Sequence, residues 1–319
     1  MIEKIVERAK CGTGCSKQEA VFLLEVNESD LFRGATQIRE IHFGTAIQLC
    51  AIINAKNGRC DMDCAFCSQS GCADTPIEAY DFMPSDRLAE EMQRILQHND
   101  CRCSVVTSGG KLEKDELHIL IKTAKQFEGE PLCASLGRLT AEELKALKAS
   151  GVIRFHHNLE TSKNFYPSIC TTQDWEERRA TVQAAQAVGM DICSGGLFGL
   201  GESWEDRIDL ALTLRDLGVD SVPINFLYAH EGTRLANQSI LSAAEALRII
   251  ALYRFLLPTV TLRICGGRTH VLGDRQSELF AAGANGMMTG NYLTVAGSQY
   301  ESDLEMINQL DLHVVQHKK

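Results

Sequence analysis

The sequence has few of the features that mark membrane, secreted or nucleic-acid-binding proteins. No apolar run is long enough to span a bilayer, which argues against an integral membrane protein. The start, Met-Ile-Glu-Lys-Ile-Val-Glu-Arg, is charged and amphipathic and does not resemble a signal peptide. Positive charge is scarce: 32 Lys and Arg against 42 Asp and Glu give a net charge of −10, which argues against nucleic acid as a substrate.

Proline is also scarce, with 6 residues in 319, and no Pro/Ser-rich linker or low-complexity stretch divides the chain. One large catalytic domain is therefore the better interpretation. Cysteine, in contrast, is abundant: the chain has 13. Without an export signal, so many cysteines indicate the reducing cytoplasm, where they serve as thiols or metal ligands.

Three of these cysteines form a compact motif, Cys-Asp-Met-Asp-Cys-Ala-Phe-Cys, with thiols at Cys60, Cys64 and Cys67. Three neighbouring thiolates can hold three irons of a 4Fe–4S cubane and leave the fourth iron open to another ligand. A zinc site is the first alternative, but zinc usually takes four ligands in paired spacing, and no clean second pair follows. Ordinary core cysteines are the second alternative, although three in eight residues with two Asp between them do not look like core packing.

The CxxxCxxC spacing is the signature of the radical S-adenosylmethionine (SAM) superfamily, and the chain resembles that superfamily here. In its members the amino and carboxylate groups of SAM chelate the open iron. An electron from the cluster then cleaves SAM to a 5′-deoxyadenosyl radical.

The rest of the chain predicts a (β/α)8 barrel. Short β-rich runs alternate with amphipathic helical segments, and eight such units in about 250 residues suit that fold. An open doubly wound sheet gives a similar alternation, so the pattern does not settle closure. We expect a helical extension over residues 1–45 and the barrel domain over residues 46–319. The strand candidates are Gln48–Ala55, Arg102–Ser108, Leu132–Gly137, Val152–Glu160, Asp191–Leu200, Ser221–Tyr228, Thr259–Cys265 and Asn285–Gly290.

The motifs lie where such barrels place their chemistry, at the carboxyl ends of the strands. The three-cysteine motif directly follows the first predicted strand. Ser108, Gly109 and Gly110 end the second, where exposed backbone amides can approach a polar ligand closely. We therefore expect these three residues to contact the methionyl group of SAM.

Four further cysteines fall on separate predicted strands: Cys103, Cys133, Cys193 and Cys265. Arg263 shares a strand face with Cys265, because side chains alternate between the two faces of a strand. Each cysteine alone is more simply a small core residue. Four on separate strands beside an arginine favour a second iron–sulfur cluster inside the barrel.

Residues from about 40 to 295 resemble the biotin synthase family, radical SAM enzymes that insert sulfur into dethiobiotin. The similar stretches include His157-Asn158-Leu159-Glu160-Thr161, Cys193-Ser194-Gly195-Gly196, Gly199-Leu200-Gly201-Glu202 and Val222-Pro223-Ile224-Asn225. They occur in order through most of the barrel. The CxxxCxxC motif alone identifies only the superfamily.

The resemblance implies a role for each matching residue. Cys60, Cys64 and Cys67 would hold the 4Fe–4S cluster that cleaves SAM. Asn158 and Asn225 would hydrogen-bond the ureido ring of dethiobiotin and SAM. Glu160 would bind the SAM ribose, Arg178 the SAM carboxylate and Lys56 the dethiobiotin carboxylate. The ligands of the auxiliary 2Fe–2S cluster, the family's sulfur source, would be Cys103, Cys133, Cys193 and Arg263.

The chain departs from the family pattern at three positions. Glu160 stands where Asp is common, His156 where Asn is usual, and Cys265 where Ser is usual. Cys265 matters most, because a fourth inward thiol could displace Arg263 as a ligand. We hypothesise that the auxiliary cluster has four Cys ligands and more than two irons. The alternative is that Cys265 packs beside an ordinary 2Fe–2S site.

The sequence thus predicts a radical SAM sulfurtransferase that makes biotin from dethiobiotin in the cytoplasm. No residue is needed as a general acid or base. Flavodoxin or ferredoxin is the implied electron donor, and a homodimer is expected from the family. The rivals are a related radical SAM enzyme of the hydrogenase-cofactor maturation or methylornithine synthase type, and a non-enzymatic iron–sulfur carrier. The cysteines left without a role are Cys11, Cys15, Cys50, Cys72, Cys101 and Cys170.

Overall fold

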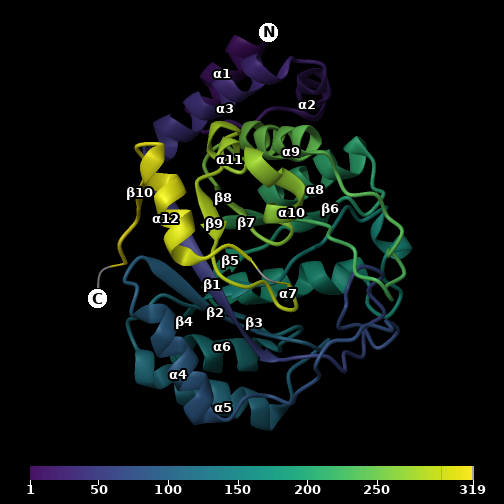
Figure 1. The fold of residues 1–319 in the computed structure, drawn as a ribbon, viewed down its shortest axis with the longest axis vertical. Coiled ribbons are helices and arrows are strands. Elements are labelled where there is room, and N and C mark those ends of the chain that lie inside the picture. Colours follow the sequence, from purple (N-terminus) through teal and green to yellow (C-terminus); the bar gives the residue numbers. More distant parts are fainter. Residues whose placement is uncertain (296, 318–319) are drawn as a thin grey trace.

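The computed structural model describes residues 1–295 and 297–317, and its centre is a closed barrel of parallel strands (Figure 1). Neighbouring strands follow the order β1-β2-β3-β4-β5-β7-β8-β9, and β9 pairs with β1 to close the ring. The strands are β1 (Ala46–Lys56), β2 (Cys101–Thr107), β3 (Leu132–Ser135), β4 (Val152–His156), β5 (Asp191–Cys193), β6 (Gly196–Phe198), β7 (Ser221–Phe226), β8 (Thr261–Ile264), β9 (Gly286–Met288) and β10 (His313–Val314). The (β/α)8 barrel is confirmed, and the alternative of an open sheet is excluded.

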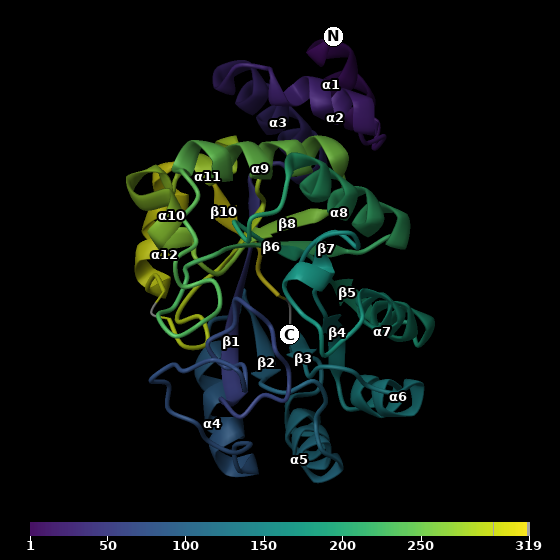
Figure 2. The same ribbon diagram turned by 90° about the vertical axis from the view of Figure 1, so that its right-hand side faces the viewer.

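Helices connect the strands and form the outer layer (Figure 2). Several begin at a capping box, in which a polar side chain and the third helical residue satisfy each other's free backbone N–H groups. Thr140 with Glu143 and Ser203 with Asp206 are examples. The connecting helices are α4 (Ser85–Leu96), α5 (Lys114–Ala124), α6 (Ala141–Ala149), α7 (Trp175–Ala187), α8 (Trp204–Leu217) and α9 (Ala243–Leu256), with the 3-10 turns η1 (Lys125–Phe127) and η2 (Tyr166–Ser168).

Three helices precede the barrel: α1 (Ile2–Lys10), α2 (Lys17–Leu24) and α3 (Glu28–Phe43). They form a group at one end of the molecule, where α3 packs against α9 (Figures 1 and 2). Ser16 and Glu19 form a capping box that starts α2. The helices occupy the predicted extension, and the domain boundary at residue 45 stays a prediction.

The chain after β8 completes the barrel and folds back along it. Its elements are α10 (Arg268–Leu272), η3 (Gly273–Arg275), α11 (Glu278–Ala281) and α12 (Tyr300–Gln309), and β10 then adds to the edge of β1. A buried ion pair between Arg268 and Asp303 ties α10 to α12 at 2.9 Å. Within the described ranges, no helix is both long and apolar enough to cross a membrane.

The fifth predicted strand differs from the structure in one respect, because Asp191–Leu200 is split into β5 and β6. Glycines make this break possible. A Cβ on Gly195 would lie 2.1 Å from the Pro223 carbonyl oxygen, and one on Gly196 would lie 2.5 Å from the Glu160 carbonyl oxygen. Only glycine lets the backbone approach β7 and the Glu160 loop so closely.

Candidate active site

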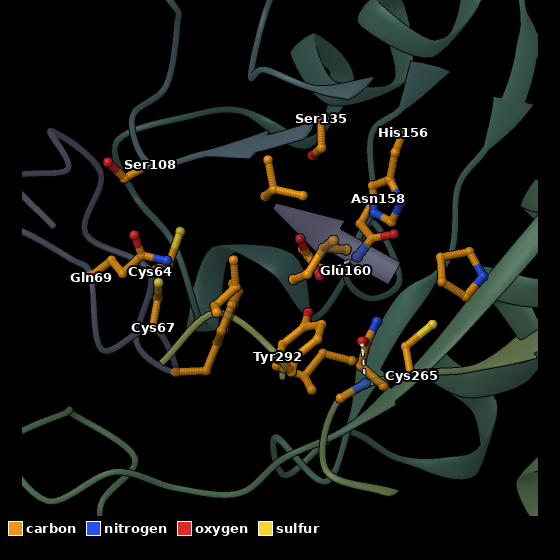
Figure 3. Close-up of a pocket in the computed structure, with 18 of the residues that line it drawn as sticks. Cys64, Cys67, Gln69, Ser108, Ser135, His156, Asn158, Glu160, Cys265 and Tyr292 are labelled. Carbon is orange, nitrogen blue, oxygen red and sulfur yellow. Dashed lines mark hydrogen bonds between the residues drawn. The ribbon is translucent and has the colours of Figure 1, made fainter. Parts of the chain in front are cut away.

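A cavity of about 320 Å³ occupies the barrel interior and its carboxyl-end loops. Its lining residues come from the loop after β1, from the ends of most barrel strands and from the loop after β9. Figure 3 shows Cys64 and Cys67 on one side of the cavity and Cys265 on the other, with Glu160, Asn158 and Tyr292 between them. The cavity therefore has two thiol-bearing ends.

The first end is the three-cysteine motif, and Cys60, Cys64 and Cys67 all line the cavity. The loop that carries it folds back on itself: Cys60 N–H donates to the Gln69 carbonyl at 3.2 Å, and Cys67 N–H donates to the Cys64 carbonyl at 3.2 Å. The Asp63 carboxylate fixes the same loop by accepting hydrogen bonds from the hydroxyls of Thr171 (2.6 Å) and Thr172 (2.9 Å). These contacts orient the three thiols toward one space.

The chemistry of the three thiols fits an iron–sulfur cluster. Burial raises the pKa of Cys60, and it raises that of Cys67 to about 11. Such thiols become thiolates only beside a positive group, which the irons of a cluster provide. Among the described residues, no group of three Cys, His, Asp or Glu converges on a point that suits a single metal ion. In a cubane each thiolate binds a different iron, so convergence on one point is not required.

The wall beside this end is built from the residues after β4. Glu160 has a backbone φ of 68°, which is unusual for a residue with a side chain. Its backbone is held by Leu197 N–H, which donates to the Glu160 carbonyl at 2.8 Å. Its side chain is 14% exposed, and its carboxylate lies 3.6 Å from the Arg178 guanidinium and accepts a hydrogen bond from the Asn158 amide at 3.4 Å.

The charges in this wall compensate each other. Burial raises the pKa of Glu160, and the positive charges of Arg178 and His156 act against that shift. Arg178 is fixed by donating to the Tyr166 hydroxyl at 2.8 Å and to the Asn158 carbonyl at 2.9 Å. The wall thus presents a carboxylate, an amide and a guanidinium side by side, a set suited to a polar ligand with hydroxyl and carboxylate groups.

Two more predicted contacts line the cavity. Ser108, Gly109 and Gly110 follow β2, and Gly110 N–H donates to the Asp61 carboxylate at 2.8 Å. Asn225 is buried on β7, where its oxygen accepts from Gly266 N–H at 3.0 Å and its amide donates to the Gly196 carbonyl at 3.1 Å. Those bonds fix the orientation of the Asn225 amide.

The second end of the cavity carries Cys133, Cys193, Cys265 and Arg263. The register places Cys193 of β5 beside His156 of β4. Burial raises the pKa of Cys193, but His156 and nearby arginines outweigh burial and bring it to about 7. Arg263 donates to the backbone and side-chain oxygens of Gln48, each at 3.3 Å.

Two predicted site residues, Lys56 and Cys103, do not line the cavity. Lys56 forms an ion pair with Glu116 of α5 at 2.8 Å and does not line the cavity. A register irregularity between Asn54 and Lys56 breaks the alternation that would have turned Lys56 inward. Cys103 is fully buried in the hydrophobic core on the other face of β2.

Several lining residues were missed by sequence reasoning. Cys50 lines the cavity, although no role was predicted for it, and Arg102, Arg154 and Tyr292 also line it. Alternation along a strand groups Cys50 with Ile52 and Arg102 with Ser104, but by itself it does not say which group faces inward. Tyr292 lies in the loop after β9, where no periodic pattern applies.

The chain matches two family models: the Radical SAM superfamily over residues 56–214, and the Biotin and Thiamin Synthesis associated domain over residues 223–313. It is 52% identical over 305 residues to the biotin synthase of Desulfovibrio desulfuricans, covering 95% of this chain and 96% of that protein. It is 47% identical over 298 residues to the biotin synthase of Syntrophus aciditrophicus, covering 92% of each.

Solved structures show the same architecture at lower identity. Methylornithine synthase (PylB) aligns with a TM-score of 0.84 and 18% identity, covering 98% of each chain. The [FeFe]-hydrogenase maturase HydG aligns with a TM-score of 0.81 and 17% identity, covering 98% of this chain and 75% of the other. At this identity the likeness concerns the fold alone.

Proposed function

The chain belongs to the biotin synthase family of radical SAM enzymes, and we propose that its two-ended cavity is the place where sulfur is inserted into dethiobiotin to give biotin. One observation carries this proposal. A single cavity presents the three-cysteine motif at one end and a second set of strand-borne thiols at the other. A sulfurtransferase needs both ends, because one supplies the radical and the other supplies sulfur.

Cys60, Cys64 and Cys67 would hold the 4Fe–4S cluster, which together with SAM would supply the radical that removes a hydrogen atom from a saturated carbon of dethiobiotin. The protein then has to position SAM and dethiobiotin and to keep water away from the reacting atoms. Glu160 accepts hydrogen bonds from the SAM ribose, and Arg178 pairs with the SAM carboxylate. Ser108, Gly109 and Gly110 border the methionyl group.

Dethiobiotin lies between the two ends. Asn158 and Asn225 hydrogen-bond its neutral ureido ring, since amide groups can both donate and accept. Both side chains are held by backbone partners, Gly195 N–H for Asn158 at 3.1 Å and Gly266 N–H for Asn225 at 3.0 Å. A fixed site that excludes water keeps a reactive carbon next to its sulfur donor. Lys56 is not assigned to the substrate carboxylate, because Glu116 already pairs with it.

The thiols at the inner end of the cavity would hold the auxiliary iron–sulfur cluster. We propose that Cys265 is one of its ligands, so that the site holds more than two irons. Support comes from Cys265 lining the same cavity as Cys133 and Cys193. Iron and sulfide counts on a Cys265→Ala variant test this point, and a two-iron auxiliary site unchanged by the substitution would contradict it.

The remaining partners follow from the chemistry and the family. We propose flavodoxin or ferredoxin as the one-electron donor, a homodimer as the assembly and the cytoplasm as the location. Thirteen free cysteines support a reducing compartment.

An anaerobic assay tests the proposed function. Reconstituted, reduced protein is mixed with SAM and dethiobiotin, and 5′-deoxyadenosine and biotin are quantified by mass spectrometry. Both products are expected from the unmodified protein and neither from Cys67→Ala. Deoxyadenosine without biotin, from protein with intact clusters, would contradict dethiobiotin as the substrate.

A further inference from the structure

The strand register decides which cysteines of β1 and β2 face the barrel interior. Cys103 lies in one row with Ala51 of β1 and Leu132 of β3. The next row contains Ile52, Ser104 and Cys133. Paired residues of parallel strands share a face, and successive residues alternate. Since Ser104 and Cys133 line the cavity, the row with Cys103 must face the helices.

The surroundings of Cys103 agree with this orientation. Besides Cys133, the charged groups that act on its thiol are Arg94 and Glu91, both from the outer helix α4. Its side chain is completely buried among apolar residues. The position that points inward on β2 is Ser104, whose hydroxyl is a poor ligand for iron compared with a thiolate.

Cys50 supplies the thiol that β2 lacks. On β1 it pairs with Arg102 of β2 and with Met288 of β9, and all three residues line the cavity. Cys50 and Cys265 line the same cavity. The inward thiols of the barrel are therefore Cys50, Cys133, Cys193 and Cys265.

Arg263 lies among these inward thiols. It lines the cavity together with Cys50, Cys133, Cys193 and Cys265, whereas Cys103 is not part of the lining. The guanidinium donates to Gln48, two residues before Cys50 on β1. The Arg263 guanidinium is thus held in place by hydrogen bonds to Gln48 on β1, the strand that carries Cys50.

Two more arginines point into the same space with unused donors. Nε and Nη1 of Arg102 are buried and have no hydrogen-bond partner among the residues that the structure describes, and the same holds for Arg154. Both line the cavity. Buried donors without partners are costly, and buried positive charge requires an anion nearby; Arg154 has a long ion pair with the exposed Asp191, at 3.4 Å. A cluster ligated by thiolates carries net negative charge and sulfur acceptors, so it satisfies both needs.

We propose that Cys50 is the fourth thiolate ligand of the auxiliary cluster, in the place expected for Cys103, and that Arg263 donates hydrogen bonds to the cluster without ligating it. This inference rests on the proposed function, since it concerns the same site. Arg102 and Arg154 provide the additional positive charge around the cluster. The ligand set then comes from β1, β3, β5 and the end of β8.

Matched alanine variants of the two cysteines test the proposal. Cys50→Ala and Cys103→Ala are prepared in the full chain, reconstituted anaerobically and analysed for iron, sulfide and the spectra of both clusters. Cys50→Ala is expected to lose the auxiliary cluster and keep about four irons, those of the SAM cluster. Cys103→Ala is expected to keep both clusters. Full iron content in Cys50→Ala, or loss of the auxiliary cluster in Cys103→Ala, would overturn the proposal.

Two controls separate this test from folding and from the proposed function. Circular dichroism and thermal melting show whether each variant folds, and formation of 5′-deoxyadenosine reports the SAM cluster by itself. If the unmodified protein holds only one cluster, the sulfur-donor function itself fails. If Cys50→Ala does not fold, electron–nuclear double resonance on the unmodified protein with isotope-labelled arginine decides: a nitrogen directly bound to the auxiliary cluster contradicts the proposal, and its absence supports it.

Discussion

Replacing Arg178 by Met removes the buried positive charge beside Glu160, and we expect SAM binding to become sensitive to acid. The two side chains are 11% and 14% exposed, and their nearest charged atoms are 3.6 Å apart. At an effective dielectric constant of ~20, a pair at that distance interacts by roughly 4–5 kcal/mol. Since about 1.4 kcal/mol already changes an ionisation equilibrium tenfold, loss of this interaction is large enough to change the protonation of Glu160.

The direction of the effect follows from the ionised form of Glu160, which accepts the ribose hydrogen bonds in our proposal. Burial already raises the pKa of Glu160 above its ordinary value. Without Arg178 the pKa of Glu160 rises further, and His156 and the hydrogen bond from Asn158 are the remaining influences that favour ionisation. SAM affinity is therefore expected to fall as the pH decreases, and the midpoint of this fall is expected to lie at higher pH in Arg178→Met than in the unmodified protein.

The assay is equilibrium binding of SAM to reconstituted protein between pH 5.5 and 8.5, a range chosen around neutrality. Arg179→Met is the matched control, because Arg179 is the next residue of α7, 41% exposed, and pairs with Glu176 on the surface. Its profile should match that of the unmodified protein. An Arg178→Met variant that folds and binds SAM with an unchanged pH profile would refute the reasoning.

Three further predictions concern the buried ion pair, the glycines and the thiols. Asp303→Asn should lower the free energy of unfolding by about 3–5 kcal/mol, because it leaves Arg268 buried and unpaired at 4% exposure. The exposed-pair control Glu91→Gln should cost less than about 1 kcal/mol in the same urea titration, and equal losses would contradict the role of burial. Gly267→Ala should destabilise more than Gly273→Ala in thermal melts: both have positive φ, but a Cβ on Gly267 would lie 2.0 Å from the Phe226 carbonyl oxygen and one on Gly273 would meet nothing within 4 Å. The shared conformational cost is roughly 1–2 kcal/mol, so equal melting shifts would show that the Phe226 contact relaxes. Finally, Cys60→Ala should abolish deoxyadenosine formation while Cys11→Ala, an exposed thiol of the N-terminal extension, should not change it, and loss of activity in both would argue against a specific cluster site.

The fold was predictable because its signals are local. Each predicted strand overlaps an observed one, and the capping residues Ser16 and Glu19 start a helix as expected. Closure of the barrel depends on β1 pairing with β9, residues far apart in the sequence, and local periodicity carries no information about that pairing. The break between β5 and β6 also depends on a distant contact, the approach of Gly195 to Pro223.

In the site, too, the features that depend on local sequence were predictable and those that depend on distant contacts were not. The three-cysteine motif is contiguous in sequence, so its thiols were found together. Cys103 was predicted to face the cavity and Cys50 was given no role, because the inward face of a strand depends on its register with the neighbouring strands. Lys56 was assigned to the cavity on its position in a motif, and the irregularity at the end of β1 directs it to Glu116 instead. One extra residue in a strand reverses the face of every residue after it.

The most direct test of the account follows the sulfur atom itself. The auxiliary cluster is assembled with isotopically heavy sulfide, excess sulfide is removed, and a single turnover is run with SAM and dethiobiotin under anaerobic conditions. The account predicts that the biotin formed carries the heavy isotope. Biotin with sulfur of natural isotopic composition would contradict the claim that the inner thiols of the cavity hold the sulfur donor.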